Sequence, residues 1–209
     1  SLKKENEQLI KRITELETSL ADTYNEKVET ERLRGLASVT ETAPELHFIA
    51  ADVVLTSADG YGSTFSVNKG TLDGITLNSV AVAAGGLVGK VTAVGLNWAT
   101  VTAITDPSMS VGATVKRSEA TGVTEGETAL RANGCCRLSY LTPDASVVRG
   151  DLVFTSGLGG VFPAGIFIGT VSQVESEENG LAQNATIEVG ADLTSLRRIY
   201  ITDGAWNGE

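Results

Sequence analysis

The stretch that decides the fold spans residues 150–171 and reads GDLVFTSGLGGVFPAGIFIGTV. It places an apolar run typical of a strand before a glycine-rich turn, and a second apolar run after Pro163. The stretch holds no obvious pairing of nucleophile and base and no set of metal ligands. It therefore predicts two β-strands joined by a tight turn, and its importance lies in architecture.

The composition agrees with a mainly β protein. The chain has 209 residues, of which 42% are hydrophobic but only 5% are aromatic, and 23 are glycines. Because the apolar residues are mostly Val, Ile, Leu and Ala, we expect short strands joined by tight turns around one or two modest cores.

The charge distribution argues against two classes of partner. Of the net charge of −10, residues 1–36 carry −1 and the rest of the chain carries −9. Nucleic acids and anionic lipid headgroups both need a positive surface. We therefore expect the body to bind neither nucleic acid nor lipid directly.

The two cysteines, Cys135 and Cys136, are adjacent. Neighbouring side chains of a strand point to opposite faces, so we expect one buried and one exposed thiol, with a strained vicinal disulfide as the alternative. The chain has one histidine, and its spacing from the cysteines suits no zinc site. No metal and no cofactor are expected.

Residues 1–36 show the pattern of a coiled coil. Residues spaced alternately by four and three form a seam that predicts pairing with a second copy of the chain: Leu2, Asn6, Leu9, Ile13, Leu16 and Leu20. A buried Asn6 amide costs stability but selects register and two strands, so we expect a parallel homodimer. The alternative is an amphipathic helix packed on its own β body.

The seam changes after Leu20. The expected core positions hold Thr23 and Lys27, while the next apolar residues are Tyr24 and Val28, a shift typical of a stutter. Gly35 is expected to end the helix and to open a linker over residues 37–45. No apolar run is long enough to span a membrane. The chain begins inside a helical pattern, so a membrane segment could precede Ser1.

From Leu46 onward the apolar pattern has a period of two. It predicts twelve strands: Leu46–Thr56, Ser63–Val67, Val80–Ala83, Leu87–Val94, Thr100–Ile104, Ser110–Lys116, Thr121–Glu125, Cys135–Leu141, Asp151–Thr155, Ile166–Val174, Ala185–Val189 and Leu196–Ile201. Many short strands without an interior helix are typical of barrels and sandwiches.

An internal echo favours two barrels over one large sheet. Residues 78–91 and 150–171 both contain a strand, a glycine turn and a second strand with an internal glycine. We expect a first antiparallel barrel over residues 46–120, with strands in 185–203 as candidates to complete it. A second barrel is expected over 121–205, followed by a tail at 206–209.

The order of these features resembles the extracytoplasmic part of MreC, a rod-shape-determining protein family of bacteria. The resemblance rests on the coiled coil, an Asn-Lys-Gly turn at 68–70, the strand at 86–91, an Ile-Thr-Asp-Pro-Ser turn at 104–108 and the block at 150–171. The structural motif residues are Gly70, Gly74, Gly86, Gly89, Gly150, Asp151, Ser156, Gly157, Gly160, Pro163, Gly165 and Gly169.

The resemblance implies a non-catalytic scaffold that maintains cell shape by organising peptidoglycan synthesis at the membrane. The implied architecture is an N-terminal coiled-coil helix followed by two small antiparallel β-barrels outside the cell membrane. The implied partners are a second copy of the chain, MreD, a class B penicillin-binding protein, the RodA glycosyltransferase and MreB filaments. A single membrane helix before Ser1 would anchor the protein.

A chymotrypsin-like serine hydrolase is the alternative, because that family also consists of two β-barrels. His47, Asp106 and Ser156 occur in its His-Asp-Ser order. However, Ser156 lacks the preceding glycine and aspartate of those proteases. We therefore expect Ser156 to be a turn hydroxyl and the protein not to be an enzyme.

Overall fold

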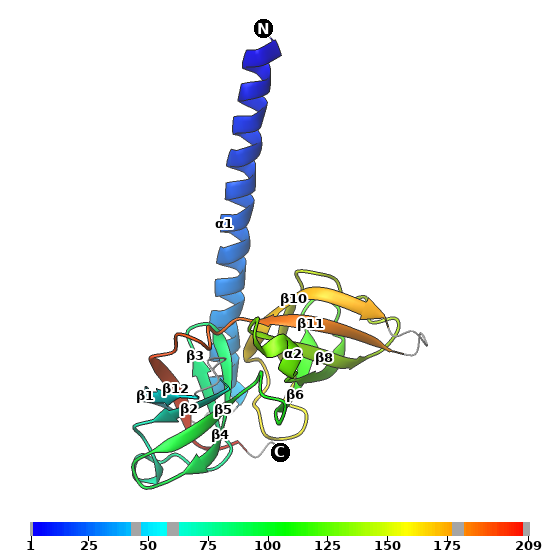
Figure 1. The fold of residues 1–209 in the computed structure, drawn as a ribbon. Coiled ribbons are helices and arrows are strands. Elements are labelled where there is room, and N and C mark those ends of the chain that lie inside the picture. The colour runs from blue at the N-terminus through cyan, green and yellow to red at the C-terminus, as the bar shows by residue number, and fades with distance from the viewer. Residues whose placement is uncertain (1, 43–46, 58–62, 177–181, 207–209) are drawn as a thin grey trace.

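A long helix precedes two β-barrels (Figure 1). The computed structural model describes residues 2–42, 47–57, 63–176 and 182–206. Helix α1 (Leu2–Thr42) runs past Gly35, so the expected helix end at that glycine is wrong. One interior glycine costs only about 1 kcal/mol relative to alanine, which a helix of 41 residues tolerates. Of the expected linker, residues 37–42 are helical and 43–45 lie outside the described residues.

The first barrel is closed and antiparallel. Its strands follow the order β1-β12-β3-β4-β5-β2 around the barrel. Their bounds are β1 (Phe48–Thr56), β2 (Thr64–Val67), β3 (Ser79–Ala83), β4 (Gly86–Val94), β5 (Ala99–Ala103) and β12 (Arg198–Ala205). A short 3-10 helix, η1 (Thr71–Asp73), connects β2 to β3.

The second barrel is also closed and antiparallel, with the strand order β10-β11-β8-β7-β6-β9. Its strands are β6 (Ser110–Val115), β7 (Thr121–Glu125), β8 (Cys135–Leu141), β9 (Leu152–Thr155), β10 (Phe167–Ser176) and β11 (Gln183–Val189). A single helical turn, α2 (Thr128–Arg131), precedes β8.

The mainly β fold class with two barrels is confirmed, and each of the twelve predicted strands overlaps an observed one. Two expectations about their arrangement differ from the structure. β6 belongs to the second barrel, so the boundary expected at residues 120 and 121 is misplaced. Only β12 completes the first barrel, because β11 pairs with β8 and β10 of the second. The expected absence of interior helices is also wrong, given η1 and α2.

Both barrels are filled by aliphatic side chains, and each is bent where a glycine interrupts a strand. Gly89 and Gly169 lie where the pairing register shifts. A Cβ atom at Gly89 would collide with the carbonyl oxygen of Thr102, and one at Gly169 with that of Glu188. These two strands therefore need glycine for close pairing, which confirms the structural echo between the two halves.

The two barrels meet at a junction built from glycines and aromatic rings. Gly85, in the turn between β3 and β4, lies against Gly190 of the second barrel, and Gly86, the first residue of β4, lies against Phe167. The Phe167 ring packs on Phe154 with 5.4 Å between ring centroids. With Leu152, these two phenylalanines form a buried cluster apart from the main core.

Candidate functional site

Helix α1 exposes an apolar stripe that no barrel covers. Its described part, here called the helix seam, consists of Asn6, Leu9, Ile13, Leu16 and Leu20. The four apolar side chains of the helix seam are 54–76% exposed, and the side chain of Leu2 lies outside the described ones. The helix projects away from the barrels along this stretch (Figure 1). This geometry disfavours the alternative in which the helix packs on its own body.

The chemistry of the helix seam suits a two-stranded coiled coil. The seam alternates between a position held by Asn6, Ile13 and Leu20 and a position held by Leu9 and Leu16. A β-branched residue at the first position and leucine at the second favour parallel dimers. Outside the seam, Arg12 and Glu15 form an exposed ion pair of 3.7 Å, as expected for the solvated face of such a helix.

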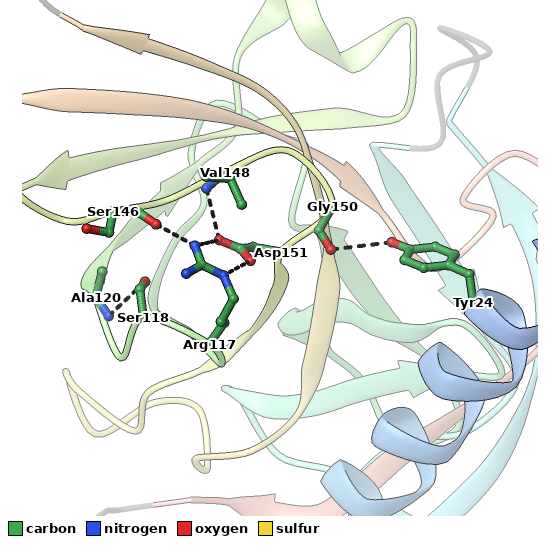
Figure 2. A network of polar contacts seen from close by, with 8 residues as sticks. All are labelled: Tyr24, Arg117, Ser118, Ala120, Ser146, Val148, Gly150 and Asp151. Atoms are coloured by element: carbon green, nitrogen blue, oxygen red, sulfur yellow. Dashed lines mark hydrogen bonds and ion pairs between the residues drawn. The ribbon is translucent and has the colours of Figure 1, made fainter. Parts of the chain in front are cut away.

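Tyr24 marks the point where the helix reaches the second barrel. Its hydroxyl donates to the carbonyl oxygen of Gly150 at 3.5 Å, and its side chain is 41% exposed, less than any apolar member of the helix seam. Figure 2 shows the ring extending from α1 toward Gly150. The sequence pattern marked Tyr24 as the seam's departure from its repeat, but not as a contact with the barrel.

The turn that contains Gly150 is held by a network around Asp151 (Figure 2). The Asp151 carboxylate accepts hydrogen bonds from Arg117 Nε at 2.7 Å and Nη2 at 2.8 Å, and from the Val148 backbone N–H at 2.9 Å. Arg117 also donates to the Ser146 carbonyl. The hydrogen bond from Arg117 to Asp151 raises the pKa of the guanidinium, which keeps the pair ionised.

The block at residues 150–171 contains β9 and the start of β10, so the two predicted strands are observed. The segment that joins them, residues 156–166, is longer than the expected tight turn. Positive φ angles occur at Gly150, Gly157, Gly159, Gly160 and Gly165. The buried Thr155 hydroxyl donates to the Pro163 carbonyl and accepts from the Ile166 N–H at 2.9 Å. The Ser156 hydroxyl accepts from the Leu158 N–H at 3.2 Å, as a turn hydroxyl does.

The structure assigns the residues of the hydrolase alternative to separate local bonds. The backbone N–H of His47 donates to Asp203 Oδ1 of β12, and Asp106 Oδ1 accepts from the Ser108 hydroxyl. Neither bond involves Ser156. These interactions hold turns and strand ends together and give no catalytic arrangement.

One cysteine is buried as predicted, whereas the other is less exposed than expected. Cys135 is half-buried and Cys136 is buried, and both are free thiols. Burial raises the pKa of Cys136 to about 12, so this thiol is not available as a thiolate. In the described part of the chain, no group of three or more His, Cys, Asp or Glu residues has the arrangement of a metal site.

A second apolar surface lies at the end of the first barrel and was not predicted from the sequence. It consists of the exposed side chains of Leu72, Leu96 and Trp98, here called the tip patch. The Leu72 N–H donates to the Leu96 carbonyl at 3.0 Å, which joins η1 to the turn between β4 and β5. Gly70 permits this contact, since a Cβ there would lie 2.7 Å from the Leu96 carbonyl oxygen. The available signal in the sequence was a leucine and a tryptophan, Leu96 and Trp98, within three residues of the turn glycine Gly95.

A model of the protein family described as "Rod shape-determining protein MreC, barrel core" matches residues 53–203 of the chain. The chain belongs to the MreC family. The match covers most of both barrels, so the family resemblance read from the sequence is confirmed. MreC proteins of this family are named as determinants of cell shape.

Individual MreC proteins support the same conclusion. The cell shape-determining protein MreC of Listeria monocytogenes is 34% identical over 203 residues, covering 94% of this chain and 67% of that protein. A solved Listeria MreC structure superposes with a TM-score of 0.71 at 31% identity, covering 98% of this chain and 97% of that one. Helix α1 is therefore included in the similarity.

Two further solved MreC structures share the fold. One, described as the major periplasmic domain from the cell shape-determining filament MreC, has a TM-score of 0.65 at 25% identity and covers 77% of this chain and 96% of that one. The other is a Helicobacter pylori MreC in complex with the penicillin-binding protein PBP2, with a TM-score of 0.61 at 18% identity and coverage of 76% and 98%. Within the described residues, α1 and α2 lack the length or the apolar character needed to cross a bilayer.

Proposed function

We propose that this chain is a non-catalytic scaffold that maintains cell shape by organising peptidoglycan-synthesis enzymes at the outer face of the cell membrane. The observation that carries the proposal is the combination of MreC-family barrels with an exposed coiled-coil seam on one chain. A scaffold needs surfaces rather than a reaction centre. The helix seam and the tip patch are such surfaces, and the Asp106 and Ser156 side chains of the hydrolase alternative form hydrogen bonds within their own turns.

The first element of the proposal is a parallel homodimer through the helix seam. Four apolar side chains more than half exposed on one stripe are costly in water, and pairing with the same stripe of a second copy removes them from it. A dimer presents every barrel surface twice, which raises the effective concentration of the second site for any partner that is itself held nearby.

The second element is the partner. A class B penicillin-binding protein is supported by the complex of the Helicobacter MreC with PBP2. The wider assembly that we propose includes MreD, RodA and MreB, with an N-terminal membrane helix holding the dimer beside them. The periplasmic location of another MreC supports the proposed side of the membrane.

The dimer is tested by sedimentation equilibrium on matched helix variants. The triple variant Leu9→Ser, Ile13→Ser and Leu16→Ser removes the centre of the helix seam. The control, Lys4→Ser, Lys11→Ser and Thr18→Ser, places the same residue type on the opposite side of the helix. We expect dimers for the parent and the control and monomers for the seam variant. If the seam variant remains a dimer, the dimer interface lies on the barrels and not on the helix seam.

The partner is tested by capture from detergent-solubilised cell envelope, followed by labelling with a fluorescent penicillin. The parent and the control triple variant should retain a labelled class B penicillin-binding protein. We expect the monomeric seam variant to retain less of it, because avidity is lost. Recovery of no penicillin-binding protein by the parent would contradict this part of the proposal.

The absence of catalysis is tested with a fluorophosphonate probe, which labels activated serines. We expect no labelling of Ser156, because its hydroxyl oxygen accepts a bond within its own turn. Labelling that is lost in Ser156→Ala would favour the hydrolase alternative.

A further inference from the structure

The contact between Tyr24 and Gly150 joins two parts of the molecule that have different tasks. Leu20 and the residues before it are free to pair with a second copy, whereas Tyr24 lies against the second barrel. In the heptad that places Leu20 in the seam, Tyr24 lies beside the core rather than in it. The Tyr24 side chain can therefore contact the second barrel while the helix seam pairs with a second copy of the chain.

The acceptor of this contact is held firmly on both sides. The Gly150 N–H donates to the Val171 carbonyl at 2.8 Å, which ties the turn to β10. The next residue, Asp151, is fixed by the two bonds from Arg117 and by the Val148 N–H. The Gly150 carbonyl therefore points in a direction set by the barrel, and Figure 2 shows it facing Tyr24.

Holding the second barrel also constrains the first. Gly85 and Gly190 are in backbone contact, and a Cβ on Gly190 would collide with the Gly85 carbonyl oxygen. Such a close junction leaves little room for the barrels to rotate past each other. One contact between the helix and the second barrel thus influences the direction in which both barrels face.

We propose that Tyr24 is a positioning residue that couples the paired helices to the second barrel and so sets the orientation of both barrels relative to the dimer axis. This inference rests on the dimer of the proposed function and deepens it. Pairing alone brings two chains together, whereas Tyr24 determines which surfaces of the barrels the dimer presents to a partner.

The test measures a distance between α1 and the second barrel by electron paramagnetic resonance. Spin labels are placed at the exposed positions Ser19→Cys and Ser176→Cys in a Cys135→Ser background. The buried Cys136 stays, because its raised pKa of about 12 keeps it from labelling. Excess unlabelled chain ensures that most of the dimers that carry label contain only one labelled copy, so the measured distance is within one chain.

The variants are Tyr24→Ala, which removes the ring, and Tyr24→Phe, which removes only the hydroxyl. The control is Tyr140→Phe on β8, which removes a hydroxyl from an exposed tyrosine elsewhere on the second barrel. We expect a narrow distance distribution in the parent and the control, and roughly a doubling of its width in Tyr24→Ala, because local anchoring is lost. Broadening in Tyr24→Phe would show that the hydrogen bond contributes as well as the ring.

An unchanged distribution in Tyr24→Ala would overturn the inference. Sedimentation equilibrium on the same samples reports the dimer independently, so a monomeric parent would contradict the proposed dimer without affecting the distance measurement. Far-ultraviolet circular dichroism verifies that each variant retains the fold, so broadening with an unchanged spectrum reports orientation and not unfolding.

Discussion

Gly85 of the first barrel and Gly190 of the second lie in direct backbone contact, and a Cβ on either one would collide with the carbonyl oxygen of the other. These residues are 105 positions apart in the chain. The contact brings the turn between β3 and β4 against the segment that follows β11, beside the buried Phe154 and Phe167 rings. The junction between the barrels therefore depends on two positions at which only hydrogen fits.

A methyl group at this junction should destabilise the protein. We expect Gly85→Ala to lower the free energy of unfolding by roughly 1–3 kcal/mol, the usual cost of overpacking a tight contact. Urea unfolding measures the change. The control is Ala84→Ser, which adds one atom at the exposed neighbouring residue. Equal stability of Gly85→Ala and the control would show that the junction opens at no cost.

The turn in the block at residues 150–171 should depend on one hydroxyl. Thr155→Val keeps the side-chain shape but leaves the Ile166 N–H and the Pro163 carbonyl without this partner. A loss of roughly 1–3 kcal/mol in unfolding free energy is expected, because buried polar groups lose a hydrogen bond. Thr170→Val on β10 is the control, because the Thr170 side chain is only half-buried. If thermal denaturation gives the same midpoint for both variants, the Thr155 bonds do not stabilise the turn.

Asn6 should limit the helix pairing to two strands. We expect Asn6→Ile to raise the thermal midpoint of the paired helix while producing species larger than a dimer, since isoleucine removes the buried amide that specifies two strands. Asn25→Ile, on the opposite side of α1 from the helix seam, is the control. Light scattering coupled to size-exclusion chromatography measures the masses. A single dimeric species for Asn6→Ile would show that Asn6 does not select the oligomeric state.

Stability should fall in acid partly through Asp192, in the loop that leads from β11 to β12. The Ser195 hydroxyl donates to its carboxylate at 2.6 Å, and together with bonds from Thr194 it lowers the carboxyl pKa below its ordinary value of 3.8. A carboxyl with a lowered folded-state pKa contributes its stability above the unfolded-state value, and this contribution is lost as pH falls through the folded-state value.

We therefore expect Asp192→Asn to have a lower free energy of unfolding than the parent at pH 6. At pH 3 the two free energies should lie closer together. Urea unfolding at both pH values makes the comparison. Asp22→Asn, on the exposed face of α1, serves as the control for removal of one negative charge. If Asp192→Asn and the parent differ in unfolding free energy by the same amount at both pH values, the charge of the Asp192 carboxylate is not the cause of the difference.

Local patterns in the sequence predicted much of the structure. Apolar patterns between turn residues identified all twelve strands. A strand with one buried face, such as β6, repeats every two residues, whereas β3 and β9 are buried throughout and are continuous short runs. The spacing of Leu9, Ile13 and Leu16 predicted the seam, because residues alternately four and three positions apart lie on one face of a helix. The internal glycines that the sequence showed in both halves, Gly89 and Gly169, lie at register shifts, because a glycine inside a strand marks a bulge or a close approach.

Local patterns could not assign strands to barrels. β6 and β12 read as ordinary strands, and nothing in their own residues states which neighbours they pair with. Pairing is decided by the closure of each barrel, in which β12 returns from the end of the chain to lie between β1 and β3. The expected boundary at residues 120 and 121 failed because it followed chain order rather than this closure.

The sequence by itself determined the long helix with its seam, the strands and the family, because each depends on residues close together in the chain. Only the tertiary structure decided the membership of β6 and β12, the contact of Gly85 with Gly190 and the bond from Tyr24 to the Gly150 carbonyl. These relationships join segments up to about 150 residues apart, and long-range pairing and packing determine them rather than local periodicity.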